Sequence, residues 1–179
     1  MSLSNFRELG LTAPLADALK KQGITDPTEI QSQTIPHAIG GRDIMASPET
    51  GSGKTLAFLL PIIQRLGHPG ATRALVLAPT RELALQIEAN ARIYGRKSGL
   101  RTVAVVGGQS LPSQIKALRT GVDILVATPG RLNDLLERGS VQLKTIEVFV
   151  LDEADRMLDM GFLPQVRRII QHLPRKRQT

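Results

Sequence analysis

Short apolar runs recur along this chain, and residues typical of turns follow each of them. Between the runs lie longer stretches whose apolar residues are spaced three or four apart, as on one side of an amphipathic helix. Strands that alternate with helices predict an α/β fold, in which a parallel sheet is covered by helices on both faces. The five strands predicted in this way are residues 43–47, 74–78, 102–106, 123–127 and 147–151.

Helices are predicted before, between and after these strands. Leu15 and Leu19 mark one near the start of the chain, with Pro14 in its first turn and Gly23 at its end. Residues 1–40, here called the lead, precede the first predicted strand, so we expect them to wrap the edge of the sheet or the ligand site. The other predicted helices are residues 28–37, residues 54–66, a helix marked by Leu83, Ile87 and Tyr94, and residues 162–173.

The composition is that of a globular domain, with 41% hydrophobic and 22% charged residues. A chain of 179 residues can bury a full core, and we expect a single domain. The longest apolar run, residues 56–63, contains Pro61 and is too short for a membrane span, and the first ten residues do not resemble a signal peptide. The absence of cysteine excludes disulfides, thiolate metal sites and a cysteine nucleophile, and it fits a cytoplasmic protein.

The charge balance points to an anionic partner. The chain has 23 basic and 16 acidic residues and a net charge of +7, which favours nucleic acid over a membrane, although solubility explains the charge equally well. Aromatic residues make up only 3%, so a nucleic acid is expected to be held by its backbone rather than by stacked bases. The basic residues Arg175, Lys176 and Arg177 are interpreted as a solvated segment rather than as an RNA patch.

A glycine-rich sequence lies between the first predicted strand and the helix at 54–66, where a phosphate-binding loop is expected. Glycines allow backbone conformations closed to other residues and let amide groups face phosphate oxygens, while the helix N-terminus adds positive charge. Lys54 is predicted to reach the β- and γ-phosphates, and the Thr55 hydroxyl is predicted to ligate Mg²⁺. Pro48 departs from the usual small residue at the first position of such a loop. The residues of this phosphate loop are Thr50, Gly51, Ser52, Gly53, Lys54 and Thr55.

Two acidic residues, Asp152 and Glu153, follow the last predicted strand. A carboxylate that ends a buried strand beside a phosphate loop can hold Mg²⁺, and a second one can position or deprotonate an attacking water. An Asp-Glu pair after a strand can also simply cap a helix. We favour the metal-binding interpretation because adjacent parallel strands would bring these carboxylates close to Lys54.

The sequence Asp152-Glu153-Ala154-Asp155, together with the phosphate loop, resembles the DEAD-box RNA helicases, in particular their first RecA-like domain. The resembling elements follow the order of that family and extend from residue 6 to residue 155. Besides these two, they are a Q motif at residues 23–31 with Phe6 upstream, motif Ia at 79–84, a glycine doublet at Gly107-Gly108 and motif Ib at 128–131.

The resemblance implies a nucleotide site. Gln31 and Phe6 would contact adenine, since a glutamine amide can both donate to and accept from the edge of that base. The phosphate loop, from Thr50 to Thr55, would hold the phosphates of ATP or ADP. Lys54, Asp152 and Glu153 would be catalytic, and Thr55 and Asp152 would hold Mg²⁺.

The resemblance also implies contacts to the sugar–phosphate backbone of RNA, independent of base sequence. Hydroxyl, guanidinium and glycine amide groups suit such contacts. The residues expected to make them are Pro79, Thr80, Arg81, Gly107, Gly108, Thr128, Pro129, Gly130 and Arg131.

For the whole chain, the resemblance implies a RecA-like P-loop fold with a Q-motif region at residues 1–40 and a P-loop core at 41–179. The family's second RecA-like domain, with its arginine fingers, is not among these residues, so we expect a fragment that binds nucleotide but scarcely hydrolyses it. The full-length protein is expected to hydrolyse ATP in order to unwind or remodel RNA, with no membrane partner. A DNA translocase and a stand-alone RNA-binding module are the alternatives, and the sequence that follows residue 179 would distinguish them.

Overall fold

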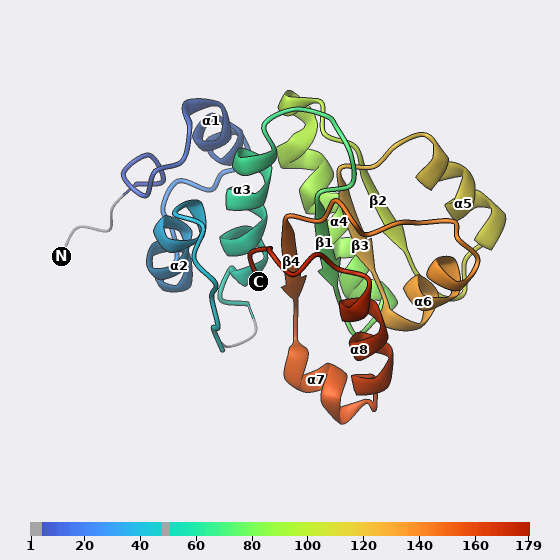
Figure 1. Cartoon of the computed structure of the whole chain (residues 1–179). Helices are drawn as coiled ribbons and strands as arrows, with labels where there is room; N and C mark the ends of the chain where they lie inside the picture. The colour runs from blue at the N-terminus through green and yellow to red at the C-terminus, as the bar shows by residue number, and fades with distance from the viewer. Residues whose placement is uncertain (1–4, 48–50) are drawn as a thin grey trace.

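The computed structural model describes residues 5–47 and 51–179. Its strands are β1 (Ala74–Leu77), β2 (Thr102–Val105), β3 (Ile124–Ala127) and β4 (Val148–Leu151). They form a parallel sheet in the order β2-β3-β1-β4 (Figure 1). The predicted α/β class with a parallel sheet is confirmed, as are four of the five predicted strands.

Helices precede the sheet and connect its strands. They are α1 (Ala13–Lys21), α2 (Glu29–Ile39), α3 (Lys54–Leu66), α4 (Arg81–Gly95), α5 (Leu111–Arg119), α6 (Pro129–Glu137), α7 (Ala154–Asp159) and α8 (Leu163–Gln171), with a short 3₁₀ helix at Arg96–Ser98. All the predicted helices are confirmed, whereas α5, α6 and α7 were not predicted. Within residues 5–47 and 51–179, none of the helices has the length and apolar character needed to cross a bilayer.

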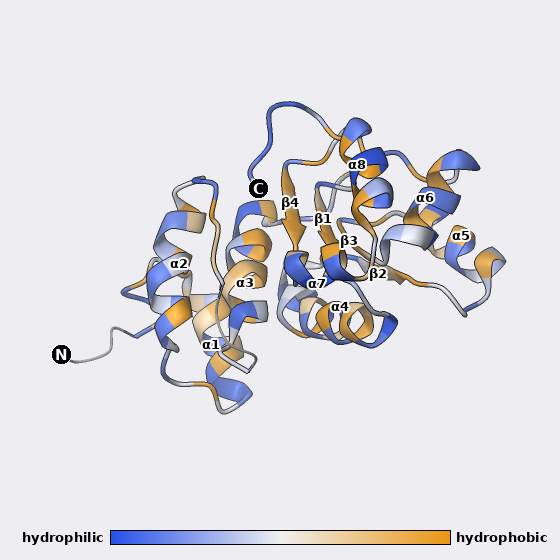
Figure 2. Cartoon of the chain, turned by 90° about the horizontal axis from the view of Figure 1, so that it is seen from below, coloured by the Kyte–Doolittle hydropathy of each residue, from blue (hydrophilic) through white to orange (hydrophobic). Residues whose placement is uncertain are grey.

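Apolar side chains pack on both faces of the sheet, because neighbours along a strand point to opposite sides. On one face, Val76 packs in a cluster with Ile63 of α3 and Ile87 of α4. On the other face, Leu77 packs in a cluster with Leu132 of α6 and residues of α8. Figure 2 shows the apolar strands between these layers of helices. The strands are therefore buried on both sides, which explains their continuous apolar runs.

The lead packs against α3 at the β4 side of the sheet (Figure 1). Leu19 of α1 and Ile35 of α2 are fully buried there. The Gln64 side chain of α3 fixes the turn before α1, since its Oε1 accepts from the Thr12 N–H at 2.8 Å and its Nε2 donates to the Gly10 carbonyl at 3.0 Å. The lead was expected to wrap the edge of the sheet or the ligand site, and the structure places it on α3, with Gln31 in contact with the Gly53 carbonyl of the phosphate loop.

The strand predicted at residues 43–47 is wrong, because these residues belong to no strand. The structure gives them one backbone hydrogen bond, from the Ile44 N–H to the Thr179 carbonyl at 3.0 Å. Gln178 occupies the edge of β4 beside them, and its carbonyl accepts from the Phe149 N–H at 2.9 Å. A strand needs a partner that offers hydrogen bonds along its length, and Gln178 and Thr179 offer too few.

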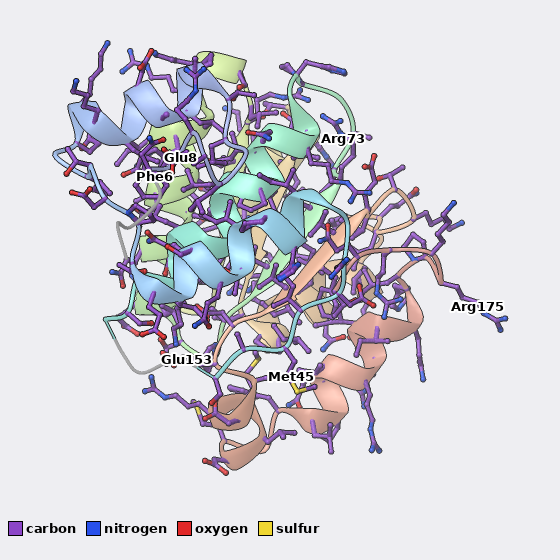
Figure 3. The ribbon with its side chains drawn as sticks, turned by 90° about the vertical axis from the view of Figure 1, so that its left-hand side faces the viewer. Phe6, Glu8, Met45, Arg73, Glu153 and Arg175 are labelled. Atoms are coloured by element: carbon purple, nitrogen blue, oxygen red, sulfur yellow. The ribbon has the colours of Figure 1, made fainter. Side chains whose placement is uncertain are left out.

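The basic segment before Gln178 is only partly solvated. Arg175 points away from the protein (Figure 3), and Arg175 and Lys176 are exposed, as predicted. The Arg177 guanidinium instead lies 5.8 Å from the centre of the Phe149 ring and donates to the Pro174 carbonyl at 2.7 Å. The solvated interpretation is therefore wrong for Arg177, which packs on Phe149 of the edge strand β4.

Asp123 is a fully buried acid just before β3. Its carboxylate accepts from the Gly70 N–H and from both the backbone N–H and the Nε of Arg101, the last at 3.0 Å. Burial by itself raises the pKa of Asp123, but the hydrogen bonds from Arg101 and Gly70 outweigh burial and hold the pKa below its ordinary value. The ionised carboxylate thus joins two loops to the start of a central strand.

We predict that the Asp123 carboxylate stabilises the fold at neutral pH but not in strong acid. Its pKa is lower in the folded chain, so its contribution is complete above the unfolded value of about 3.9 and is lost as pH falls through the folded value. Asp123→Asn should cost about 1–3 kcal/mol at neutral pH, because Arg101 is partly exposed and its charge is screened by solvent, and this cost should shrink as pH falls below about 4. Urea unfolding of both proteins across this range measures the difference, and a cost that does not depend on pH would contradict the ionic role.

Candidate functional site

The carboxyl ends of the strands share one edge of the sheet, because all the strands are parallel. The segment that leads into α3 reaches the same edge. Two neighbouring groups of polar residues lie there, one around Lys54 and the other around Arg131.

The phosphate loop depends on glycine. Gly51 and Gly53 have φ values of +81° and +87°, and Gly53 is the N-cap of α3. A Cβ on Gly53 would lie 2.6 Å from Nε2 of Gln31. Glycine is therefore required at this position both for its torsion angle and for its lack of a side chain. Pro48 and Thr50, which were singled out from the sequence, lie outside the described residues.

Lys54 begins α3 and extends toward the acidic residues that follow β4. Its Nζ is 3.5 Å from Oε1 of Glu153 and 3.8 Å from Oδ1 of Asp152. Asp152 is buried, and burial raises its pKa above the ordinary value, while the charge of Lys54 opposes this rise and that of Glu153 adds to it. The three side chains that the sequence placed together do meet in the structure.

Two buried oxygens beside Lys54 lack a hydrogen-bond partner in the described part of the chain, namely Oδ2 of Asp152 and Oγ of Ser52. A buried polar atom without a partner costs about 1–3 kcal/mol, which indicates a site that a ligand completes. Carboxylate and hydroxyl oxygens are also the ligands that Mg²⁺ prefers, and Thr55 adds a hydroxyl in the first turn of α3. No three acidic or histidine side chains converge anywhere in residues 5–47 and 51–179. These residues therefore fit a Mg²⁺ ion that completes its coordination with a ligand such as phosphate.

Glu153 has a left-handed backbone, with φ +52° and ψ +50°, at the junction of β4 and α7 (Figure 3). This conformation costs a non-glycine residue about 1 kcal/mol. Arg156 donates from Nη1 to Oε2 of Glu153 at 3.1 Å, so the Glu153 carboxylate is held between Lys54 and Arg156. Arg156 was not predicted as a site residue, although its position three residues after Glu153 was a usable signal.

Gln31 is buried at the start of α2, with only 2% of its surface exposed. Its Oε1 accepts from the Thr28 N–H at 3.0 Å, in a capping box with Thr28, and its Nε2 donates to the Gly53 carbonyl at 3.0 Å. One side chain thus joins the lead to the phosphate loop. The Thr-x-x-Gln pattern was a sequence signal for Thr28, which was not predicted. Pairing of Gln31 with adenine stays a prediction.

Phe6 is also buried and packs with the apolar residues of the lead (Figure 3). With Ile24 and Thr25 it lines a hollow beside α1. Gln31 does not line this hollow, so the structure does not bring the two predicted adenine-contacting residues into one pocket. Contact of Phe6 with adenine likewise stays a prediction.

The residues predicted to contact RNA follow β1, β2 and β3. Thr80 caps α4, since its Oγ1 accepts from the Leu83 N–H at 3.3 Å. A Cβ on Gly108 would lie 3.1 Å from Nη1 of Arg81, so the glycine doublet and Arg81 are neighbours. We call this group the strand edge: Thr80, Arg81, Gly107, Gly108, Thr128, Gly130 and Arg131. Pro79 and Pro129, also predicted, are buried behind it.

Arg131 connects the segments that follow the neighbouring strands β2 and β3. Its Nη1 donates to the Gln109 carbonyl at 3.1 Å and to Oε1 of Gln114 at 2.9 Å. The Thr128 N–H donates to the Val105 carbonyl at 3.1 Å. The start of α6 is thus tied to the loop that carries Gly107 and Gly108, and neither glutamine was singled out from the sequence.

The amino-acid sequence of this chain is similar to those of known helicases. A family model described as DEAD/DEAH box helicase matches residues 28–179. The chain is 46% identical over 183 residues to the DEAD-box ATP-dependent RNA helicase 20 of Arabidopsis thaliana. This alignment covers 99% of this chain and 36% of that protein. It is 47% identical over 175 residues to the DEAD-box ATP-dependent RNA helicase CshA of Streptococcus pneumoniae. This alignment covers 97% of this chain and 33% of that protein. The chain thus spans about a third of the length of these relatives.

We predict that Gly53→Ala destabilises the chain more than alanine at an uncrowded left-handed glycine. The torsion angle alone should cost about 1–2 kcal/mol, and contact of the new Cβ with Gln31 adds to this cost. Gly41 is the matched control, since its φ is +78° and no atom lies within 4 Å of a Cβ placed there. Adding Gln31→Ala should recover part of the loss in Gly53→Ala and none in Gly41→Ala. Unfolding free energies from urea titrations measure these effects, and equal costs at the two glycines would contradict the contact.

We also predict that Glu153→Gly is more stable than Glu153→Ala by about 1 kcal/mol, because only glycine adopts the left-handed backbone without strain. Both changes remove the carboxylate, so the comparison isolates the backbone. At Leu158, an exposed position inside α7, the order should be reversed, because glycine weakens a helix by about 1 kcal/mol relative to alanine. Thermal and urea unfolding of the four variants provide the test. A Glu153→Ala protein as stable as Glu153→Gly would show that the backbone is unstrained.

Proposed function

This chain belongs to the DEAD/DEAH box helicase family, and we propose that it is the nucleotide-binding part of an ATP-dependent RNA helicase. The observation that carries the proposal is the position of Lys54, beside a glycine loop at a helix N-terminus and within 3.8 Å of two carboxylates. The parallel sheet with helices on both faces fits a RecA-like P-loop fold. In this proposal residues 1–40 form the Q-motif region and residues 41–179 the P-loop core.

The phosphate loop, from Thr50 to Thr55, holds the phosphates of an adenine nucleotide. Its glycines turn amide groups toward the phosphate oxygens, and the N-terminus of α3 adds favourable charge. Lys54 exchanges its present partners, Asp152 and Glu153, for β- and γ-phosphate oxygens. This exchange offsets the charge of the phosphates and leaves both carboxylates free for other contacts.

Asp152 and Glu153 then have separate roles. Thr55 and Asp152 hold Mg²⁺, and the unpartnered Oδ2 of Asp152 supports this assignment. Mg²⁺ supplies positive charge against the phosphate oxygens when it is bound. Glu153, held by Arg156, orients a water molecule and accepts its proton. Lys54, Asp152 and Glu153 are thus the proposed catalytic residues.

Gln31 and Phe6 recognise the adenine base in this proposal. The Gln31 amide offers one donor and one acceptor, which match the N6 and N7 positions of adenine. In the structure each group makes one contact, Oε1 to Thr28 and Nε2 to Gly53, so the base would be bound by the second N–H of Nε2 and the second lone pair of Oε1. Because one of these contacts is to the phosphate loop, binding of the base and the shape of the loop are coupled.

The strand edge binds the sugar–phosphate backbone of RNA. Its guanidinium groups on Arg81 and Arg131, its threonine hydroxyls and its exposed glycines suit phosphate oxygens and do not read bases. Pro79 and Pro129 shape the turns from beneath. Binding of this kind is independent of sequence and weakens as salt rises.

The activity of the whole protein is also a proposal, since this chain corresponds to about a third of its relatives. We propose that a further RecA-like domain joins this one when ATP and RNA bind, and that hydrolysis drives unwinding or remodelling of RNA. The low turnover expected of the 179-residue chain alone, its cytoplasmic location and the absence of a membrane partner stay predictions.

Calorimetric titration of the chain with ADP and with GDP, in the presence of Mg²⁺, tests the nucleotide site. We expect GDP to bind at least about tenfold more weakly, because guanine does not present the edge that Gln31 matches. Lys54→Ala should weaken ADP binding by about 100-fold through loss of a charge-assisted contact, and the exposed Lys144→Ala serves as the charge-matched control. Equal affinities for ADP and GDP would contradict the role of Gln31. An unchanged ADP affinity in Lys54→Ala would contradict the phosphate loop.

A further inference from the structure

Gln114 of α5 is a buried glutamine that the proposed function leaves without a role. Only 5% of its surface is exposed. Its Nε2 donates to the Val106 carbonyl at 3.0 Å and to Oε1 of Gln109 at 3.4 Å, while its Oε1 accepts from Arg131 at 2.9 Å. One side chain therefore joins the segment after β2, the glycine loop and the start of α6.

Packing alone does not account for an amide at this position. Gln114 lies on the inward side of α5, the side on which Leu111 and Leu118 pack against the core. Its neighbours Ser113 and Lys116 are exposed. An apolar residue of similar size would fill the same space without the cost of burying polar atoms, so the hydrogen bonds are what this glutamine provides.

These hydrogen bonds determine how the Arg131 guanidinium is oriented. Both of its acceptors, Oε1 of Gln114 and the Gln109 carbonyl, bind Nη1. In the part of the chain that the structure describes, Nε and Nη2 of Arg131 make no hydrogen bond to protein. A guanidinium binds phosphate through two parallel N–H groups, and this half of the group is left for such a contact.

The acceptor on Gln114 is neutral, and this matters for the charge of Arg131. No carboxylate forms an ion pair with Arg131 among residues 5–47 and 51–179, whereas the guanidinium of Arg101, for example, is paired with Asp123. A glutamate at position 114 would hold the arginine equally well but would offset its charge. A glutamine orients Arg131 and leaves its positive charge available to an anion.

We propose that Gln114 is a positioning residue for binding of the RNA backbone. Its side chain fixes Arg131 relative to the Gly107-Gly108 loop and does not neutralise the arginine. Groups that are held in place before binding lose less conformational freedom when the ligand arrives. The inference rests on the proposed RNA-binding function of the strand edge. It adds to that function a residue that does not itself touch RNA.

Fluorescence anisotropy with a labelled single-stranded oligouridylate, titrated with the 179-residue chain at low salt, measures the effect. Gln114→Met keeps the side-chain volume but removes the amide, and it should weaken binding about tenfold through loss of a hydrogen bond to a charged group. Gln114→Glu should weaken binding at least as much although it keeps the acceptor, with a smaller loss at high salt. Ser113→Ala, at an exposed neighbour, is the matched control and should bind like the original chain.

A double-mutant cycle with Arg131→Ala shows whether Gln114 acts through the arginine. Once Arg131 is absent, Gln114→Met should weaken RNA binding less than about twofold. ADP affinity should be the same in all variants, which a general loss of folding would not allow.

Each of the following RNA-binding results would overturn the inference: full additivity in the cycle, unchanged RNA affinity in Gln114→Met, or tighter RNA binding by Gln114→Glu than by Gln114→Met. An equal loss of ADP affinity in Gln114→Met would also overturn it, because the residue would then be merely structural. If the original chain does not bind RNA, or if Arg131→Ala binds as well as the original chain, the proposed function of the strand edge fails and the inference fails with it. These outcomes separate failure of the function from failure of the positioning role.

Discussion

Parallel pairing of β1 with β3 on one side and with β4 on the other determines where the polar groups that follow the strands lie. Leu77 is level with Ala127 of β3 and with Leu151 of β4. The residues that follow these strands therefore emerge together, and each connecting helix returns the chain across a face of the sheet to start the next strand. Because apolar residues bury both faces, polar side chains can gather only at the ends of the strands. The proposed nucleotide site and the strand edge are neighbours for this reason.

The two halves of this edge differ in whether a carboxylate neutralises their basic side chain. Lys54 forms ion pairs with Asp152, which is buried and has a raised pKa, and with Glu153. These oppositely charged side chains lie where phosphate and metal are proposed to bind. Arg131 is held by a neutral amide and a carbonyl, and its charge stays uncompensated. The first arrangement suits an exchange of partners when ligand arrives. The second suits an immediate contact with an anion that needs little rearrangement.

The clearest contact of the lead with the site is made by Gln31. Gln31 is anchored at the first turn of α2 by Thr28 and contacts the carbonyl of Gly53. The absence of a side chain on Gly53 is what allows this approach. The left-handed backbone of Glu153 shows a related cost on the opposite side of the same loop. Both features place strain or close contact at the phosphate loop, while the core below it is apolar and continuous.

Much of the fold could be predicted because its signals are local. The strands at 74–77 and 124–127 are apolar throughout since both faces are buried, and α3 follows directly from its apolar stripe and from the glycines before it. Residues 43–47 carry the same local signal yet form no strand, because strand formation requires a partner and the sequence does not record which segment will lie alongside. The short helices α5 and α6 were not predicted although each has apolar residues on one side, Leu111 and Leu118 in α5 and Leu132 and Leu135 in α6, and both are stabilised by packing on the sheet.

Within the site, too, local features could be predicted from the sequence and some contacts between distant segments could not. By itself, the sequence determined the phosphate loop and the acidic pair after β4, because the chemistry of each lies in a few consecutive residues whose order sets the local backbone. The tertiary structure alone decided the contacts of Gln31 with Gly53 and of Gln114 with Arg131. These pairs are distant along the chain, and their members meet because strands stack in a particular order and bury particular helix faces. The pattern of apolar and polar residues along a sequence indicates periodicity and local conformation. The hydrogen-bond partner of a buried polar group depends instead on how distant segments pack together.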